Sequence, residues 1–206
     1  MYISINTKTG EIEFITKQST VRQDKGKNLL DFFDEYIAID LETTGLDPKF
    51  DDIIEMAAIH IKDNSVISEF QTLVNPGYQI DEFITDLTGI TNEMLEDAPR
   101  LPDVLPTFIN FLNDHVLVAH NANFDINFLY DNCITLLDKP LKNDFVDTMR
   151  LGRWLFKDFP NHKLDTMLEC FGICKQVAHR ALSDSYNAHY CYEYMKKYAN
   201  ENNINL

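Results

Sequence analysis

The chain has 206 residues, of which 45% are hydrophobic, and a formal net charge of −15, and this size is sufficient for one α/β domain with a sizeable core. No apolar run reaches the roughly 18 residues that a membrane span needs, and no basic start precedes an apolar stretch, so we expect neither a membrane span nor a signal peptide. The four cysteines have no framework spacing, and no paired histidine and cysteine set completes a zinc site, so we expect free thiols in a reducing cytoplasm.

The acidic charge also limits the kind of nucleic-acid contact. Phosphate contacts normally supply non-specific affinity, so a chain of this charge is not expected to bind long duplexes tightly. Bound divalent cations would reverse the sign of the charge locally. Chemistry on the end of a nucleic-acid chain therefore remains compatible with the composition.

The sequence pattern of the first 35 residues predicts an N-terminal extension of the domain. Residues 18–28 are polar and predict a linker. Around a glycine-containing turn at 7–10, apolar residues alternate with polar ones, which predicts a β-hairpin. These apolar residues are Ile3, Ile5, Ile12 and Phe14. We therefore expect two parts, an N-terminal extension of hairpin plus linker at 1–35 and a domain at 36–206.

Three strands open the domain. In residues 36–42 apolar side chains alternate in direction, which places Asp40 and Glu42 on one face, about 7 Å apart. Residues 53–62 and 66–74 predict two further strands, joined by a turn at 63–65.

Strands and helices alternate in the remainder of the chain. A short buried strand at 115–119 leads into a helix that Asn121 or Asn123 can cap. A strand and a helix follow from 145, and the final helix is expected at 181–198. Helical spacing marks an earlier amphipathic helix and a later one that stops at a glycine: Leu105, Phe108, Ile109 and Leu112 for the first, and Leu164, Met167, Leu168, Phe171 and Gly172 for the second. This order predicts an α/β fold with a mixed five-stranded sheet between helices.

Three short segments carry the candidate chemistry: IAIDLETTGLD at 37–47, AHNANFD at 119–125 and AHRALSD at 178–184. They contain four carboxylates and one imidazole that we expect to act together. Four carboxylates are suitable ligands for two hard divalent cations, and an imidazole titrates near neutrality. This combination suits the hydrolysis of a phosphodiester bond. The five residues are Asp40, Glu42, Asp125, His179 and Asp184.

The three segments, in this order, resemble the motifs of the DEDDh (DnaQ-like) 3′→5′ exonucleases, which have a ribonuclease H-like fold. The resemblance covers about 36–198. Linking text at 73–77 (LVNPG), 87–91 (LTGIT) and 97–99 (DAP) is most similar to the exonuclease domain of Gram-positive PolC-type replicative polymerases and their free-standing relatives. The resemblance therefore implies a ribonuclease H-like domain, and the N-terminal extension lies outside the part of the chain that it covers.

The resemblance also implies roles for individual residues. The four carboxylates would hold two Mg²⁺ or Mn²⁺ ions, and His179 would be the general base. Leu87 and Phe124 suit core packing equally well. The residues expected to contact the terminal nucleotide are Thr43, Thr44, Gly45, Leu46, Leu87, Thr88, Asn121 and Phe124. Asp147, which precedes a threonine, is expected to cap a helix or to form hydrogen bonds at the edge of the core instead of binding metal.

The expected activity is metal-dependent removal of 5′-mononucleotides from the 3′ end of mainly single-stranded DNA, in proofreading or repair. A DNA polymerase is an expected partner. Two alternatives stay open: an RNA 3′-end trimming exoribonuclease, because only contacts to the 2′-OH distinguish RNA from DNA, and an exonuclease-like interaction module. Such a module should have lost at least one of the five residues, and all five are present.

Overall fold

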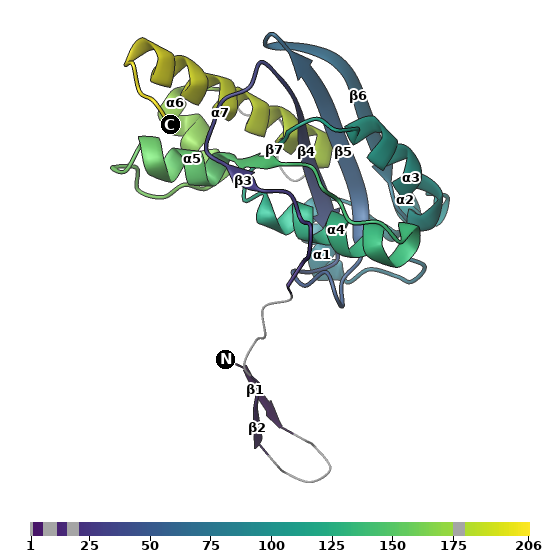
Figure 1. Cartoon of the computed structure of the whole chain (residues 1–206). Coiled ribbons are helices and arrows are strands. Elements are labelled where there is room, and N and C mark those ends of the chain that lie inside the picture. Colours follow the sequence, from purple (N-terminus) through teal and green to yellow (C-terminus); the bar gives the residue numbers. More distant parts are fainter. Residues whose placement is uncertain (1, 6–11, 16–20, 175–179) are drawn as a thin grey trace.

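The computed structural model describes residues 2–5, 12–15, 21–174 and 180–206. Six strands form the central sheet, in the order β3-β8-β7-β4-β5-β6 (Figure 1). β4, β7, β8 and β3 run parallel to one another, and on the other side of β4 the strand β5 is antiparallel to both of its neighbours, β4 and β6. The strands are β3 (Asn28–Leu29), β4 (Glu35–Thr43), β5 (Ile53–Lys62), β6 (Ser65–Leu73), β7 (Leu117–Ala119) and β8 (Phe145–Asp147).

The sixth strand was not expected. Asn28 falls in the predicted linker, yet Asn28 and Leu29 pair with Phe145 and Val146 of β8. The N–H of Phe145 donates to the Lys27 carbonyl at 2.9 Å, which extends this pairing by one step. The open edge of β8 therefore recruits a segment whose sequence has no strand pattern of its own.

The residues before β3 also contact the domain. Arg22 forms a bidentate pair with Asp131 at 2.6 and 2.8 Å, and the Lys25 ammonium donates to Asn127 at 2.7 Å. Residues 21–29 thus lie along the domain, while the division of the chain at residue 35 stays a prediction. Further upstream, β1 (Tyr2–Ile5) and β2 (Ile12–Ile15) pair antiparallel as the hairpin predicts, and the expected turn at 7–10 lies outside the described residues.

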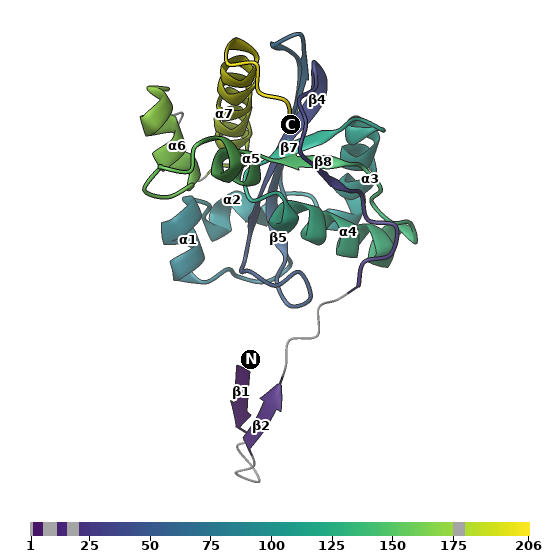
Figure 2. The same cartoon turned by 60° about the vertical axis from the view of Figure 1, so that its left-hand side comes forward.

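Helices cover both faces of the sheet, with α3 and α4 on one face and α5, α6 and α7 on the other (Figure 2). Successive side chains of β4 point to opposite faces of the sheet and so pack in both hydrophobic cores. Ile37 and Ile39 belong to the core under α3 and α4, and Tyr36 and Ala38 belong to the core under α5, α6 and α7. Burying such a side chain fully contributes about 1.5–3 kcal/mol. The helices are α1 (Glu82–Thr88), α2 (Asn92–Glu96), α3 (Leu101–Leu112), α4 (Asn123–Leu137), α5 (Thr148–Leu155), α6 (Leu164–Phe171) and α7 (Ala181–Glu201).

Local turn chemistry explains some of the element ends. Asp63 and Asn64 both have positive φ, 49° and 58°, as a two-residue hairpin turn between β5 and β6 requires. α6 stops at Gly172, where φ is 68°. The predicted cap of α4 was wrong: its N-cap is Ala122, without a side-chain hydrogen bond. Asn121 adopts φ of 60° and accepts the Phe124 N–H through its backbone carbonyl instead.

Among the described residues, none of the helices combines the length and the apolar character that crossing a membrane would require.

Candidate active site

Three of the predicted carboxylates meet above β4. Asp40 and Glu42 lie two residues apart on this strand, so both side chains point to the face that α7 covers. Asp184 lies in the first turn of α7. One oxygen from each of these three carboxylates lies within 4.8 Å of the others. A strand and a helix that are far apart in sequence therefore bring the predicted acids together.

Asp125 approaches the same strand from α4. Its carboxylate accepts the backbone N–H of Leu41 at 3.1 Å, and Leu41 lies between Asp40 and Glu42. Asp125 is 2% exposed, and its charge is close enough to raise the pKa of Asp40. The hydrogen bond therefore holds the fourth carboxylate beside the other three.

The electrostatics of this cluster favour a positive ion. Burial and then the charges of Asp184 and Glu55 raise the pKa of Glu42 to about 8. Burial, followed by the charge of Asp125, raises the pKa of Asp40, and burial raises the pKa of Asp125 against two backbone hydrogen bonds that oppose it. The carboxylates therefore repel one another when ionised. An all-oxygen donor set of this kind fits hard divalent cations, which would relieve the repulsion.

The predicted base, His179, lies outside the described residues. Arg180, which follows it in the sequence, is the N-cap of α7 and makes no side-chain capping bond. Its guanidinium instead donates to Glu55 of β5, at 2.8 and 3.2 Å. The chain next to His179 is thus attached to the sheet through Arg180.

Glu55 was missed in the sequence, although it lies at the centre of this attachment. Its side chain is fully buried, and it accepts the Ala181 N–H at 3.0 Å and the Gln71 side-chain amide at 2.9 Å. Burial alone would raise its pKa, but the hydrogen bonds from Arg180, Ala181 and Gln71 outweigh burial and lower it. Glu55 also pairs directly with Glu42 across the two strands. A lone carboxylate within an apolar strand, IIEMAAIHIK, was the available signal, because such a group needs a cationic partner.

The end of β4 and the segment after it form one wall beside the carboxylates. Thr43 is buried and donates to the Gly45 carbonyl at 2.6 Å, and the Thr44 hydroxyl accepts the Asp52 N–H at 2.9 Å. A Cβ added at Gly45 would lie 2.4 Å from the Asp51 carboxylate, so a larger residue here would displace the Asp51 side chain. Leu46 is 85% exposed and is available to a ligand.

The other predicted contacts differ in their environment. Thr88 is buried and its hydroxyl donates to the Ile84 carbonyl, so this side chain supports α1, while Leu87 is exposed. Phe124 packs against Phe128 with ring centroids 4.9 Å apart, as its core-packing alternative requires. Asn121 is exposed.

Asp147 acts as a structural cap, as predicted. Its carboxylate accepts the N–H groups of Met149 and Arg150 in the first turn of α5, at 3.0 and 3.4 Å. It also accepts the Asn121 N–H at 3.0 Å. Asp147 therefore connects the start of α5 to the segment that leads into α4.

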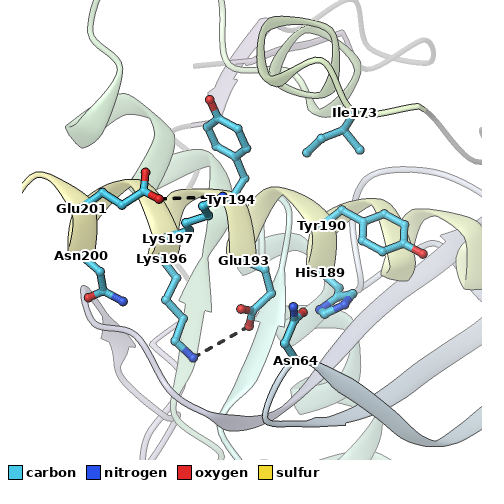
Figure 3. A pocket seen from close by; sticks show the side chains of 10 residues that line it. All are labelled: Asn64, Ile173, His189, Tyr190, Glu193, Tyr194, Lys196, Lys197, Asn200 and Glu201. Atoms are coloured by element: carbon cyan, nitrogen blue, oxygen red, sulfur yellow. Dashed lines mark ion pairs between the residues drawn. The ribbon is translucent and has the colours of Figure 1, made fainter.

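A hollow of about 660 Å³ lies along α7 and does not coincide with this cluster (Figure 3). Tyr190, Glu193 and Tyr194 line it, together with Asn64 of the β5–β6 turn. None of the predicted site residues that the structure describes lines this hollow. We therefore assign the candidate chemistry to the carboxylate cluster.

Comparisons with known proteins agree with this assignment. The family described as Exonuclease (RNase_T) matches residues 37–192. DNA polymerase III PolC-type of Caldanaerobacter subterraneus subsp. tengcongensis is 44% identical over 151 residues, covering 73% of this chain and 11% of the polymerase. The Bacillus subtilis DNA polymerase III PolC-type is 41% identical over 170 residues, covering 82% and 12%. Exonuclease X, solved in complex with 5′ overhanging duplex DNA, has a TM-score of 0.64 at 26% identity, covering 79% of this chain and 92% of its own.

The fold and the matched segments are those of a nucleic-acid-cleaving enzyme on a ribonuclease H-like sheet. The chain belongs to the exonuclease family. The expected likeness to PolC-type polymerases is confirmed, and the chain spans about a tenth of the length of these relatives.

Proposed function

We propose that this exonuclease domain is a two-metal enzyme that removes mononucleotides from the 3′ end of single-stranded DNA. The observation that carries the proposal is the convergence of Asp40, Glu42 and Asp184 within 4.8 Å. Their oxygen donors and the raised pKa of Glu42 fit two Mg²⁺ or Mn²⁺ ions. Asp125, fixed on the Leu41 N–H, would complete the ligand set.

The ions, when bound, would stabilise the negative charge on the attacking and leaving oxygens. The chain itself would supply the orientation and the proton transfer. His179 would accept the proton of the attacking water, a task that suits an imidazole at neutral pH. The wall formed by Thr43, Thr44 and Gly45 would bind the terminal nucleotide, and the exposed Leu46 would pack on its base.

DNA is the favoured substrate because the similar relatives are DNA polymerases. By the same likeness, we propose that the domain acts on strands made by a DNA polymerase, in proofreading or repair. The net charge of −15 favours short contacts near the strand end over tight binding of a long strand.

An end-labelled assay tests the proposal. Single-stranded DNA and RNA of equal sequence are incubated with the protein and Mg²⁺ or Mn²⁺, and the products are followed in time. EDTA should stop the reaction, and 5′-mononucleotides should leave from the 3′ end only. Asp184→Asn should lower kcat by roughly 10²–10³-fold, because losing a metal ligand removes several kcal/mol of transition-state stabilisation.

The matched control is Asp103→Asn, which makes the same chemical change at an exposed position of α3. This variant should keep the wild-type rate. Full activity in EDTA, or cleavage of a circular single strand, would exclude the proposal. Faster degradation of RNA would change the substrate class and leave the metal chemistry intact.

A further inference from the structure

A second cluster of metal-ligating groups lies near the start of β4. Glu35, His60 and His115 each place one ligand atom within 4.8 Å of the other two. Glu35 opens β4, His60 lies near the end of β5, and His115 lies between α3 and β7. The sequence spacing of these residues suggested no site, because three separate elements bring them together.

The distances within this cluster match tetrahedral coordination. The Nε2 atoms of His60 and His115 lie 3.2 and 3.5 Å from the same oxygen, Oε1 of Glu35. Ligands bound at about 2.0–2.2 Å around a tetrahedral zinc ion are separated by roughly 3.3–3.5 Å. The three atoms are therefore already spaced as two edges of a coordination tetrahedron require.

The hydrogen-bond partner of His115 requires a proton or a metal ion between these atoms. Its Nδ1 lies 3.3 Å from the Leu112 carbonyl, which can only accept, so Nδ1 carries the hydrogen. In a neutral ring, Nε2 then presents a lone pair to the Glu35 oxygen. Two acceptors at 3.5 Å repel each other unless a proton or a metal ion lies between them. Such a backbone contact to the other ring nitrogen is typical of histidines that bind metal.

Lys62 opposes this arrangement only in part. Its ammonium lies 2.8 Å from the other Glu35 oxygen, Oε2, and would repel a cation. The Lys62 side chain is 54% exposed, so it can turn into solvent. Glu35 Oε1 would then be available as a monodentate ligand, and water can reach the cluster because its three side chains are 20–38% exposed.

We propose that Glu35, His60 and His115 form a binding site for one zinc-like divalent cation, separate from the catalytic carboxylates. Two imidazoles and one carboxylate suit zinc and the neighbouring transition metals, whereas Mg²⁺ prefers an all-oxygen shell. Five residues of strand separate Glu35 from Asp40, which is about 17 Å. The ion would therefore take no part in cleavage, and would join β4, β5 and the connection before β7.

The experiment measures Zn²⁺ binding to the full chain in a background that silences the first cluster. Asp40→Asn with Asp184→Asn, together with excess Mg²⁺, prevents zinc uptake by the catalytic carboxylates. Titration against a chromophoric chelator should give one tight equivalent of zinc. At a free zinc concentration of 100 times Kd, the Tm should rise by roughly 5–10 °C.

Variants separate a metal site from an ion pair. His115→Ala, and Glu35→Gln, which keeps its shape, should each weaken zinc binding by more than the roughly 10–100-fold that loss of an outer-sphere partner costs. Lys62→Gln should instead tighten binding several-fold, because it removes a repelling charge beside the site. His162→Ala is the matched control, because His162 forms no hydrogen bond with a residue of the cluster. This variant should leave Kd unchanged.

The imidazole NMR signals of His60 and His115 should shift in proportion to added zinc. Zinc binding that is unchanged in His115→Ala and Glu35→Gln would overturn the proposal. So would the absence of a tight equivalent in the wild-type protein, since the cluster would then be an ion pair between Glu35 and protonated imidazole only.

Discussion

Replacing Glu55 by glutamine tests whether the carboxylate of β5 positions the start of α7. Glu55 is fully buried and accepts hydrogen bonds from Arg180 at 2.8 and 3.2 Å, from Ala181 at 3.0 Å and from Gln71 at 2.9 Å. Glutamine has the same shape, but it removes the charge and turns one acceptor into a donor that faces other donors. Arg180 and the first turn of α7 would therefore lose their attachment to the sheet.

The size of the effect follows from the exposure of the two partners. Breaking a buried ion pair costs about 3–5 kcal/mol. Because the Arg180 side chain is 35% exposed and can be solvated, we expect a loss of about 2–3 kcal/mol in the free energy of unfolding. This corresponds to a fall in Tm of roughly 4–12 °C for a domain of this size.

Activity should fall more than stability alone explains. Asp184 lies one turn after Ala181, so a shift at the start of α7 moves one carboxylate of the cluster that we propose to bind the metal ions. Misplacement of about 1 Å can lower kcat by about 100-fold. We therefore expect kcat on single-stranded DNA to fall by roughly 10–100-fold, with a much smaller change in KM.

The assay combines a thermal melt with kcat and KM measured well below the Tm of each variant. Asp131→Asn is the control, because it breaks another bidentate arginine pair, with Arg22, on a different part of the domain. It should lower the Tm and leave kcat unchanged. If Glu55→Gln also loses stability but keeps the wild-type kcat, then Glu55 supports the fold only, and the positioning argument fails.

Two further predictions concern His189, which also lines the hollow along α7, and the wall beside the carboxylates. Burial lowers the pKa of His189 to about 4. Between pH 6.5 and 4 the unfolded chain binds a proton that the folded chain does not, so stability should fall by about 2–3 kcal/mol as the pH falls through this range. His189→Asn should flatten this part of the stability curve measured by denaturant unfolding, and an unchanged slope would contradict the assignment. Leu46 is 85% exposed, so Leu46→Ala should change the free energy of unfolding by less than about 0.5 kcal/mol while raising KM roughly threefold to tenfold, which corresponds to about 1 kcal/mol of lost packing on the terminal base. Val21→Ala, at a position that is 81% exposed, is the control for Leu46, and a KM equal to that of the wild type in Leu46→Ala would exclude this contact.

The parts of the fold that depend on local pattern were predictable. Alternation along β4 placed Asp40 and Glu42 on one face, and the positive φ that Asp63 and Asn64 supply fixed the turn between β5 and β6. Gly172 likewise ended α6. In each case the residues that determine the local structure are close together in the sequence, so the sequence alone was sufficient to predict that structure.

The features that escaped prediction depend on distant partners. β3 is a strand only because β8 offers an open edge, 117 residues further along the chain. The buried carboxylate of Glu55 is stabilised by Arg180, which is 125 residues away in the sequence. The cap of α4 was wrong for a related reason: the Asn121 N–H bonds to the carboxylate of Asp147, and this favours a left-handed backbone over a capping geometry. Such pairings require the topology, which composition and periodicity do not supply.

The two-residue strand β3 also decides where this domain can be shortened. A version that begins at Tyr36, where the recognisable motif starts, would expose the outer edge of β8 and remove Phe32 and Phe33 from the core on the α7 face. The Tyr192 hydroxyl would lose the Phe33 N–H that it accepts at 2.6 Å. An unpaired strand edge beside a newly uncovered apolar surface is a template for edge-to-edge pairing. Copies trimmed in this way should self-associate through β8, whereas copies that begin at or before Val21 should stay apart.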